Sequence, residues 1–420
     1  MKKILVSLAA ASIVATAGMA DVDFKTSGQA VVYYNTVGDN AKGTDKDANL
    51  FDNTQSSKTS ANVGIQLNFD ADLKNDFTFG AQVNYLTALG LEKNLVNNTM
   101  QDTNSKLDSE GIDDDIYLSK IFLAKKVGNT TVKLGRQELP KALSPLAFSE
   151  GWNVFKNTFD AALVVNTDIK DTTIVGAFVD KTNSNGFGND MASFDNLANG
   201  AVNEAVYILT VQNKTLPMAT VTATYYALGN VGTATDSAGN PSNEGVNAYW
   251  GDVAVADKSL PMGLKVGVQA GSIVPEADAA NATNALGFKA CVTPIKDLTV
   301  GVAYSTVDNG TLNVTNLGGV KSPLYTQMIA NQTKISLHAD TYLAKATYSL
   351  GDMGNISAAF STTDDTQVKD NDSQEFDLAY TTKVAGMDIL AAYVNVQTDD
   401  KATNGVDNTD VVRVVARYNF

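Results

Sequence analysis

The stretch that decides the fold is Val411-Val412-Arg413-Val414-Val415-Ala416-Arg417-Tyr418-Asn419-Phe420. In an extended strand, successive side chains point to opposite faces. One face then carries only apolar and aromatic residues, namely Val412, Val414, Ala416, Tyr418 and Phe420. The other face carries Val411, Arg413, Val415, Arg417 and Asn419. An apolar face opposite a face with two arginines is typical of a transmembrane β-barrel strand, in which lipid-facing and lumen-facing residues alternate.

The aromatic end of this stretch is a second signal. Tyr418 and Phe420 share the apolar face, and the ending resembles the C-terminal signal by which bacterial outer-membrane proteins are recognised for insertion. The resemblance implies that the barrel-assembly machinery binds this strand. It also implies that the protein lies in the bacterial outer membrane, in contact with its lipid.

The N-terminus predicts export. Two lysines precede an apolar run that extends to about residue 17, and Gly18-Met19-Ala20 offers small residues at the cleavage positions. This pattern is typical of a secretory signal peptide, here residues 1–20. The alternative, a membrane-anchoring helix, needs a longer apolar span. We therefore expect a mature chain that forms a single barrel domain over residues 21–420.

Composition restricts the classes of function. The formal net charge of −15 argues against nucleic acid as a partner. The single cysteine, Cys291, leaves no internal disulfide framework. No segment after the signal approaches the roughly 18 to 20 consecutive apolar residues of a transmembrane helix. A content of 44% hydrophobic residues still suits a membrane barrel, because every second strand residue faces water.

Alternation along the chain predicts strands. Between residues 61 and 70 the apolar residues Ala, Val, Ile, Leu and Phe interleave with Asn, Gly, Gln and Asp. Residues 77–85 repeat the pattern, and such a sustained period of two is a strong strand signal. Alternation is poor at 116–126, 172–181 and 246–256. The predicted strands lie near 22–34, 58–70, 75–86, 116–126, 130–138, 158–167, 172–181, 202–212, 217–228, 246–256, 262–273, 284–293, 297–306, 340–350, 354–363, 373–383, 387–398 and 408–420.

The connections alternate between short and long. The intervening long ones, of about nine to over 30 residues, are rich in Asp, Asn, Thr and Gly. A barrel with short periplasmic turns and longer extracellular loops predicts this alternation. We therefore predict an all-β fold, a transmembrane antiparallel β-barrel of about 18 strands, with 16 as the alternative, around an aqueous channel. The short connections are 71–74, 128–129, 168–171, 213–216, 257–261, 294–296, 351–353 and 385–386.

The connection at residues 139–157 differs from the other long ones. It is apolar and aromatic and contains Pro140 and Pro145, whereas its neighbours are polar and acidic. An apolar loop is costly on an exposed surface, so it must pack against something. We interpret it as a loop that folds into the barrel and narrows the pore. The alternative is a loop that caps a contact between subunits.

The same region carries a family resemblance. The segments Gly135-Arg136-Gln137-Glu138-Leu139, Ser144-Pro145-Leu146 and Asn157-Thr158-Phe159 resemble the Campylobacter-type major outer-membrane porins, and a weaker likeness extends over the mature chain. The resemblance implies an 18-stranded barrel, a third loop that constricts the channel, and a homotrimer. It also implies passive uptake of small hydrophilic solutes.

Charged residues at lumen-facing positions are the candidate pore residues. Lipid-facing Lys or Arg costs roughly 2–4 kcal/mol at the bilayer midplane, so charges face inward whatever their role. A basic wall opposite acidic loop residues would create a transverse field. Arg136 is an exception, because it shares the parity of Leu134; either it lies above the bilayer or Gly135 marks a bulge that turns it inward. The candidates for the constriction and lumen are Lys133, Arg136, Glu150, Lys345, Glu375, Asp377, Arg413 and Arg417.

Acidic clusters in the long loops predict weak cation selectivity. Carboxylates at the mouth attract cations, whereas inner lysines oppose their passage. The segment 108–115 offers hard oxygen ligands for Ca²⁺, but it lacks the spacing of a known calcium loop and is better read as solvated surface. No cofactor is predicted. The clusters are Asp45 with Asp47, residues 108–115, residues 364–372, and Asp399 with Asp400.

The sequence does not predict an enzyme. His338 is the only histidine, and one histidine cannot build a His-ligated metal site. Its neighbour Ser336 leaves a base–nucleophile pair as an alternative. The leading hypothesis is an outer-membrane porin for passive diffusion of ions and small hydrophilic solutes. The alternatives are an outer-membrane structural or adhesive protein and a substrate-specific channel.

Overall fold

The computed structural model of the chain describes all but the predicted signal peptide and parts of several connections. The predicted signal peptide and most of the segment 108–115 lie outside the described residues. The described residues are 22–40, 49–51, 59–87, 101, 115–151, 153–186, 190–197, 205–229, 245–277, 280–367, 371–400 and 405–420.

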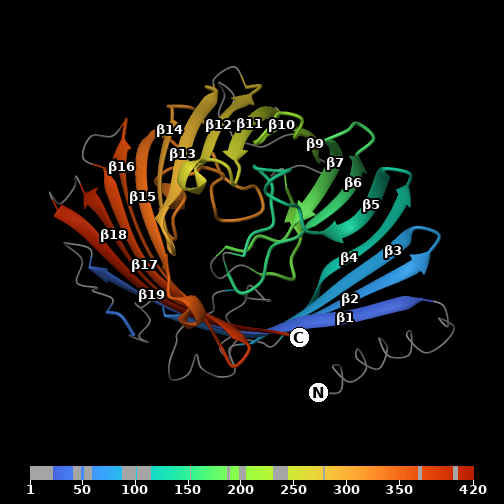
Figure 1. Cartoon of the computed structure of the whole chain (residues 1–420), viewed down its shortest axis with the longest axis horizontal. Helices are drawn as coiled ribbons and strands as arrows, with labels where there is room; N and C mark the ends of the chain where they lie inside the picture. The colour runs from blue at the N-terminus through green and yellow to red at the C-terminus, as the bar shows by residue number, and fades with distance from the viewer. Residues whose placement is uncertain are drawn as a thin grey trace, which may run out of the picture.

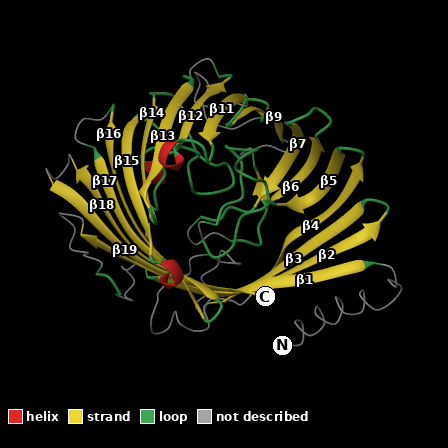
Figure 2. Ribbon diagram, in the orientation of Figure 1, coloured by secondary structure: helices red, strands yellow, loops and turns green. Residues whose placement is uncertain are grey.

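Nearly all regular structure is β (Figure 2). The described residues also include three short 3-10 turns, η2 (Pro261–Gly263), η3 (Asn331–Thr333) and η4 (Gly351–Met353). None of the described helices is long and apolar enough to cross a membrane. The strands are β1 (Asp23–Asn40), β2 (Ser60–Lys74), β3 (Phe77–Thr87), β4 (Asp115–Val127), β5 (Thr130–Gln137), β6 (Phe159–Asn166), β7 (Thr172–Thr182), β8 (Asp195–Asn196), β9 (Val206–Asn213), β10 (Ala219–Leu228), β11 (Val246–Ala256), β12 (Lys265–Pro275), β13 (Thr283–Ile295), β14 (Leu298–Val307), β15 (Ala339–Ser349), β16 (Asn355–Asp365), β17 (Ser373–Val384), β18 (Met387–Asp400) and β19 (Gly405–Asn419).

The strands form one closed antiparallel barrel (Figure 1). Apart from β8, each strand pairs with the next wall strand along the chain, and β1 pairs with both β2 and β19, which closes the ring. The two-residue β8 pairs only with the end of β7, and β7 itself is hydrogen-bonded to β9 in the wall. Without β8, 18 of the 19 strands make the wall, so the predicted barrel and its strand number are confirmed.

The terminal strand β19 has the predicted two faces. Arg413 is only 8% exposed and faces the interior, whereas Val414, at 41%, faces outward. At the seam, the backbone amide of Gly28 donates to the carbonyl of Phe420 (2.8 Å), and that of Phe420 donates back (3.0 Å). The ring of Phe420 stacks on Tyr418 with centroids 6.3 Å apart. An apolar belt therefore continues across the seam.

The connections alternate in length, although the last long ones are shorter than predicted. Residues 366–372 join β16 to β17, and β18 still pairs with β19 at Asp400 and Gly405, so only 401–404 connect them. The ladder runs further than the sequence pattern suggested, because polar residues such as Asn395 and Asn408 pair across it (2.7 Å). We name the two ends of the barrel the short-turn end and the long-loop end.

Two of the poorly alternating strands contain bulges. The pairing of β4 with β3 shifts register at Ser119, so that Tyr117 and Ser119 face inward before it and Lys120 faces inward after it. In β7 the pairing with β6 skips Asp180. An extra residue reverses the facing of everything that follows it. The bulge explains the poor alternation at 116–126, whereas over 172–179 the inward residues Val175, Ala177 and Val179 are themselves apolar and packed.

Candidate functional site

Residues 139–157, which we name the crossing loop, lie inside the ring of strands, where Figure 1 shows a green segment. One part packs against β9 and β10: the Thr210 hydroxyl donates to the Leu143 carbonyl (2.7 Å), and the Leu146 amide donates to the Tyr226 hydroxyl (3.0 Å). The other part packs on the opposite wall, where Val154 is fully buried in a cluster with residues of β1, β3 and β19. The loop therefore spans the barrel interior.

The sequence of the loop explains its position. Leu146 and Ala147 join an apolar cluster with Val246, Ala248 and Trp250 of β11. Burial of one such aliphatic side chain contributes roughly 1.5–3 kcal/mol. The inward-facing residues of β11 therefore pack against protein and are apolar, which explains the weak alternation over 246–256.

A second stretch of chain, residues 308–338, also lies inside the barrel; we name it the inner segment (Figure 1, orange). Ile335, Leu324 and Val314 are buried in the same apolar cluster as Leu146. The Leu317 amide donates to the Leu146 carbonyl (2.8 Å). Sequence reasoning noted the length of this connection and missed its position. The apolar residues scattered among polar ones between 312 and 337 were the available signal.

Glu150 joins the crossing loop to the inner segment. Its side chain is 5% exposed, and its carboxylate accepts hydrogen bonds from the amides of Val320 (2.5 Å) and Lys321 (3.1 Å to each oxygen). The side-chain amide of Asn316 is a third donor (3.2 Å) and supplies a fourth hydrogen bond. Hydrogen bonds to a charged group contribute about 1.5–3 kcal/mol each. Glu150 thus lies inside the barrel, buried between the two segments and held by protein donors.

The two arginines of β19 both face the interior. The guanidinium of Arg417 donates to the carbonyls of Asn153 (2.9 Å) and Val154 (2.7 Å) and to the side chain of Gln29 (3.1 Å). It therefore attaches the crossing loop to the wall. Arg413 donates to the Asn35 side chain (3.1 Å) and lies 5.5 Å from the centre of the Tyr33 ring.

The candidate carboxylates of β17 hold the inner segment. Glu375 and Asp377 are 1% and 7% exposed, and they accept hydrogen bonds from the amides of Ala330 (2.7 Å) and Ile329 (3.2 Å). Lys345 of β15 lies on the same inner row, because it and Asp377 both pair with the same residue of β16. The structure thus brings a basic group and two acidic groups to one side of the interior.

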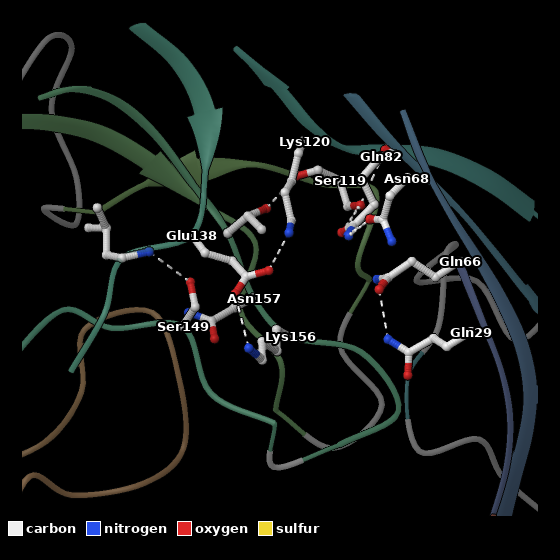
Figure 3. Close-up of polar contacts among 12 residues, drawn as sticks. Gln29, Gln66, Asn68, Gln82, Ser119, Lys120, Glu138, Ser149, Lys156 and Asn157 are labelled. Atoms are coloured by element: carbon white, nitrogen blue, oxygen red, sulfur yellow. Dashed lines mark hydrogen bonds and ion pairs between the residues drawn. The ribbon is translucent and has the colours of Figure 1, made fainter. Parts of the chain in front are cut away.

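On the opposite side, a charged triad faces a row of amide side chains (Figure 3). Glu138 at the start of the crossing loop forms ion pairs with Lys120 and with Lys156 (3.0 Å). Burial raises the pKa of Glu138, but the two lysines outweigh burial and hold this pKa below its usual value. Lys133 lies nearby on the inner wall, over the ring of Phe122 at 3.7 Å. The amides belong to Gln29, Gln66, Asn68 and Gln82 of β1–β3.

Arg136 does not face the lumen. It pairs with Ile121, which is 43% exposed on the outward face, and its guanidinium forms a bidentate ion pair with Asp160 (2.8 and 3.1 Å). Gly135 has a positive φ of 118°, yet the ladder on both sides keeps its register. The glycine therefore does not turn Arg136 inward, and a neighbouring carboxylate neutralises the outward charge instead.

Water-accessible cavities remain around the two inner stretches. One of about 690 Å³ lies between them and β16–β19, lined by Lys321, Arg413 and Arg417. One of about 650 Å³ adjoins β9–β13, and one of about 320 Å³ lies between the amide row and the charged triad. The interior is therefore narrowed into spaces of the size of small solutes, each lined in part by charged side chains.

The described residues present little catalytic chemistry. His338 contacts Asn309 through its Nδ1 atom (2.6 Å), and the Ser336 hydroxyl donates to the Thr333 carbonyl (3.2 Å), so the two are not hydrogen-bonded to each other. Within the described ranges, no group of three or more metal-ligating side chains occurs.

Comparison with known proteins identifies the family. A family model described as Gram-negative porin matches residues 7–420. No curated protein sequence matches the chain. Among solved structures, the barrel is similar to Pseudomonas aeruginosa OccK8 (OprE), with a TM-score of 0.71, 15% identity, and 95% of this chain and 98% of that chain covered.

Two further structures have the same fold. Pseudomonas aeruginosa OpdK, crystallised with vanillate, gives a TM-score of 0.72 at 13% identity over 95% of this chain and 98% of that chain. Acinetobacter baumannii OccAB3 gives 0.70 at 14% identity over 94% and 99%. At these identities the likeness concerns the fold alone. The family match over almost the whole length, together with the closed barrel and its charged interior, shows that the chain belongs to the Gram-negative porin family and is a channel protein of the bacterial outer membrane.

Proposed function

We propose that the protein is a porin for passive diffusion of ions and small hydrophilic solutes, and that the crossing loop is its constriction. The observation that carries this proposal is the attachment of residues 139–157 to both walls, through Tyr226 on one side and Arg417 on the other. A loop fixed at two opposite points reduces the open cross-section along its whole length. The cavities beside it, with charged side chains in their linings, provide the route.

The proposal includes weak cation selectivity and a homotrimer. The acidic mouth attracts cations, and the basic groups beside the constriction oppose them, which makes the net preference small. The resemblance of residues 135–159 to the Campylobacter-type porins supports three copies. The calcium site remains the weaker reading of 108–115.

A substrate-specific channel is the second candidate. The cavity beside β9–β13 combines lysines with Trp250, a combination that recognises solutes instead of only passing them. OpdK was crystallised with vanillate, so a barrel of this fold can hold a small organic acid. This candidate predicts saturable flux.

The test is conductance of the refolded protein in a planar lipid bilayer with a salt gradient. We expect stable steps, grouped in threes, and a reversal potential whose sign reports a cation preference. Replacing residues 141–154 by a short Gly-Ser linker should raise the conductance of each step. A folded protein that stays silent would favour the structural or adhesive alternative.

A further inference from the structure

One cavity of the interior has chemistry that diffusion does not require. It has a volume of about 650 Å³ and lies near the short-turn end, between the strands β9–β13 and a roof made by the crossing loop and the inner segment. The residues of its lining that matter here are Lys141, Trp250, Asp252, Gln269, Lys289 and Tyr325.

The cavity carries an excess of positive charge. Burial, together with the neighbouring charges of Lys321 and Lys289, lowers the pKa of Lys141 to about 8, although Glu150 and Asp252 act in the opposite direction. Among the described residues, neither Lys141 nor Lys289 forms an ion pair. The carboxylates nearby are already engaged, Glu150 by backbone amides and Asp252 by the Tyr325 hydroxyl.

A buried hydrogen-bond donor points to the same place. Gln269 is 1% exposed, and its Nε2 atom has no partner in the part of the chain that the structure describes. Buried polar groups are almost always hydrogen-bonded, so an orphan donor beside an open cavity indicates an acceptor from outside the protein. An anion would accept from this amide and from the lysines together.

The remaining wall is aromatic. Trp250 is 5% exposed on the inner face of β11, and Tyr325 of the inner segment lies under the Lys289 ammonium, 3.8 Å from the ring centre. Gly267 makes this arrangement possible, because a Cβ atom there would lie 2.6 Å from Lys289 and 2.8 Å from the Tyr325 hydroxyl. The cavity thus combines a cationic side with a flat apolar side.

We propose that this cavity is a binding site for small carboxylate solutes that carry an apolar body. The carboxylate accepts hydrogen bonds from Lys141, Lys289 and Gln269, and the body lies on Trp250 and Tyr325. A free phosphate fits less well, because the apolar wall leaves part of its oxygens without donors. Entry of the solute into this cavity rests on the proposed channel function. Binding of the solute to the folded protein does not depend on that function.

Trp250 serves as the reporter of binding. The sequence contains two tryptophans, so a Trp152→Phe variant leaves Trp250 as the single indole. The refolded variant is titrated in detergent with cyclohexanecarboxylate at constant ionic strength, and with cyclohexanecarboxamide as the neutral match. We expect a saturable change in Trp250 emission with the acid and none with the amide.

Lysine variants in the same background test the contacts. Lys141→Met and Lys289→Met each remove a charge-assisted hydrogen bond to the carboxylate. Each should lower the affinity for the acid by about tenfold or more. Lys141→Arg, which keeps the charge, should retain binding within a few-fold even if Lys141→Met fails to fold. Lys170→Met, in an exposed short turn, is the control and should bind like its parent. Equal affinity for acid and amide, or full binding by both lysine variants, would overturn the site.

Bilayer recordings separate this inference from the proposed function. Conductance steps without a Trp250 response would refute the carboxylate site and leave the porin standing. A saturable Trp250 response in a folded protein that never conducts would refute the porin and leave the site standing.

Discussion

The backbone amide of Lys321 donates a hydrogen bond to both carboxylate oxygens of Glu150, at 3.1 Å from each, although 171 positions separate the two residues. The contact unites two connections that leave the barrel wall at different places. Neither connection has regular secondary structure of its own across this point, so the carboxylate adds to the backbone hydrogen bond between Leu317 and Leu146 in holding the two together. Glu150 is therefore one of the contacts that set the position of the crossing loop against the inner segment.

Glu150→Gln should loosen this contact. A glutamine presents an NH₂ group where the amides of Val320 and Lys321 need an acceptor, and the lost charge-assisted bonds are worth about 1.5–3 kcal/mol each. We expect a higher mean conductance and more open-channel noise in single-channel recordings. Glu276→Gln, which alters an exposed carboxylate bonded to Asn247, is the control. Identical noise in both variants would contradict the role of Glu150.

Arg417→Lys should release the crossing loop from β19. A lysine ammonium cannot reproduce the planar fork that reaches the carbonyls of Asn153 and Val154 together. We expect conductance to rise and the temperature of barrel unfolding, followed by heat-dependent gel mobility, to fall. Arg136→Lys is the matched change on the outward face. It should lower the unfolding temperature without changing the conductance, and a change in conductance there would argue against the assignment of Arg417.

Carboxylate binding should weaken above pH 8. Lys141 has a pKa of about 8, so its ammonium is present below that pH and is lost as the pH rises through it. The other charged groups that face it are Lys321, Lys289, Glu150 and Asp252. Titration of the Trp152→Phe protein between pH 6.5 and 9.5, with Trp250 emission as the readout, should show affinity falling by about tenfold per pH unit at most. A flat profile would mean that the charge of Lys141 does not contribute.

Phe420→Ala should impair assembly of the barrel. The ring contacts Tyr418 and Gly28 at the seam, and an aromatic pair contributes about 0.5–1.5 kcal/mol beyond its buried area. We expect less heat-modifiable, folded protein in outer-membrane fractions, and Phe420→Trp should restore it. Phe24→Ala removes another outward-facing aromatic from β1 and is the control. Equal yields from both alanine variants would refute a special role for the terminal residue.

The barrel was predictable because most strands show, in their alternation of residue types, that one face meets water and the other lipid. In β2 and β19, water on one side and lipid on the other select alternating residues, and no knowledge of the partner strand is needed. The predicted inward position of Arg413, Arg417, Glu375 and Asp377 follows from the same rule. A bulge such as that at Ser119 breaks the rule without any residue type that announces it.

The interior was less predictable because its contacts join distant parts of the chain. The apolar residues of the crossing loop showed that it must pack, but nothing in them identified the inner segment as the partner. The sequence predicted Glu150 as a charge that faces the pore. Its amide donors come from the inner segment, whose position inside the barrel the sequence did not predict. Arg136 was misplaced as a lumen candidate because the compensating Asp160 lies on the neighbouring strand.

The pairing of β1 with β19 has a consequence for how the molecule is made. Arg417 and Gln29 are 388 positions apart, and direct closure of so long a loop costs about 5 kcal/mol in chain entropy. Successive hairpins avoid most of that cost, since each new strand pairs with the one before it and carries the growing edge around the circle. Until the circle closes, two strand edges offer unpaired amides and carbonyls to any other chain, and neither edge can rest in hydrocarbon. The open sheet is therefore the species most exposed to aggregation, and a helper that shortens its lifetime gains most by acting where the two edges meet.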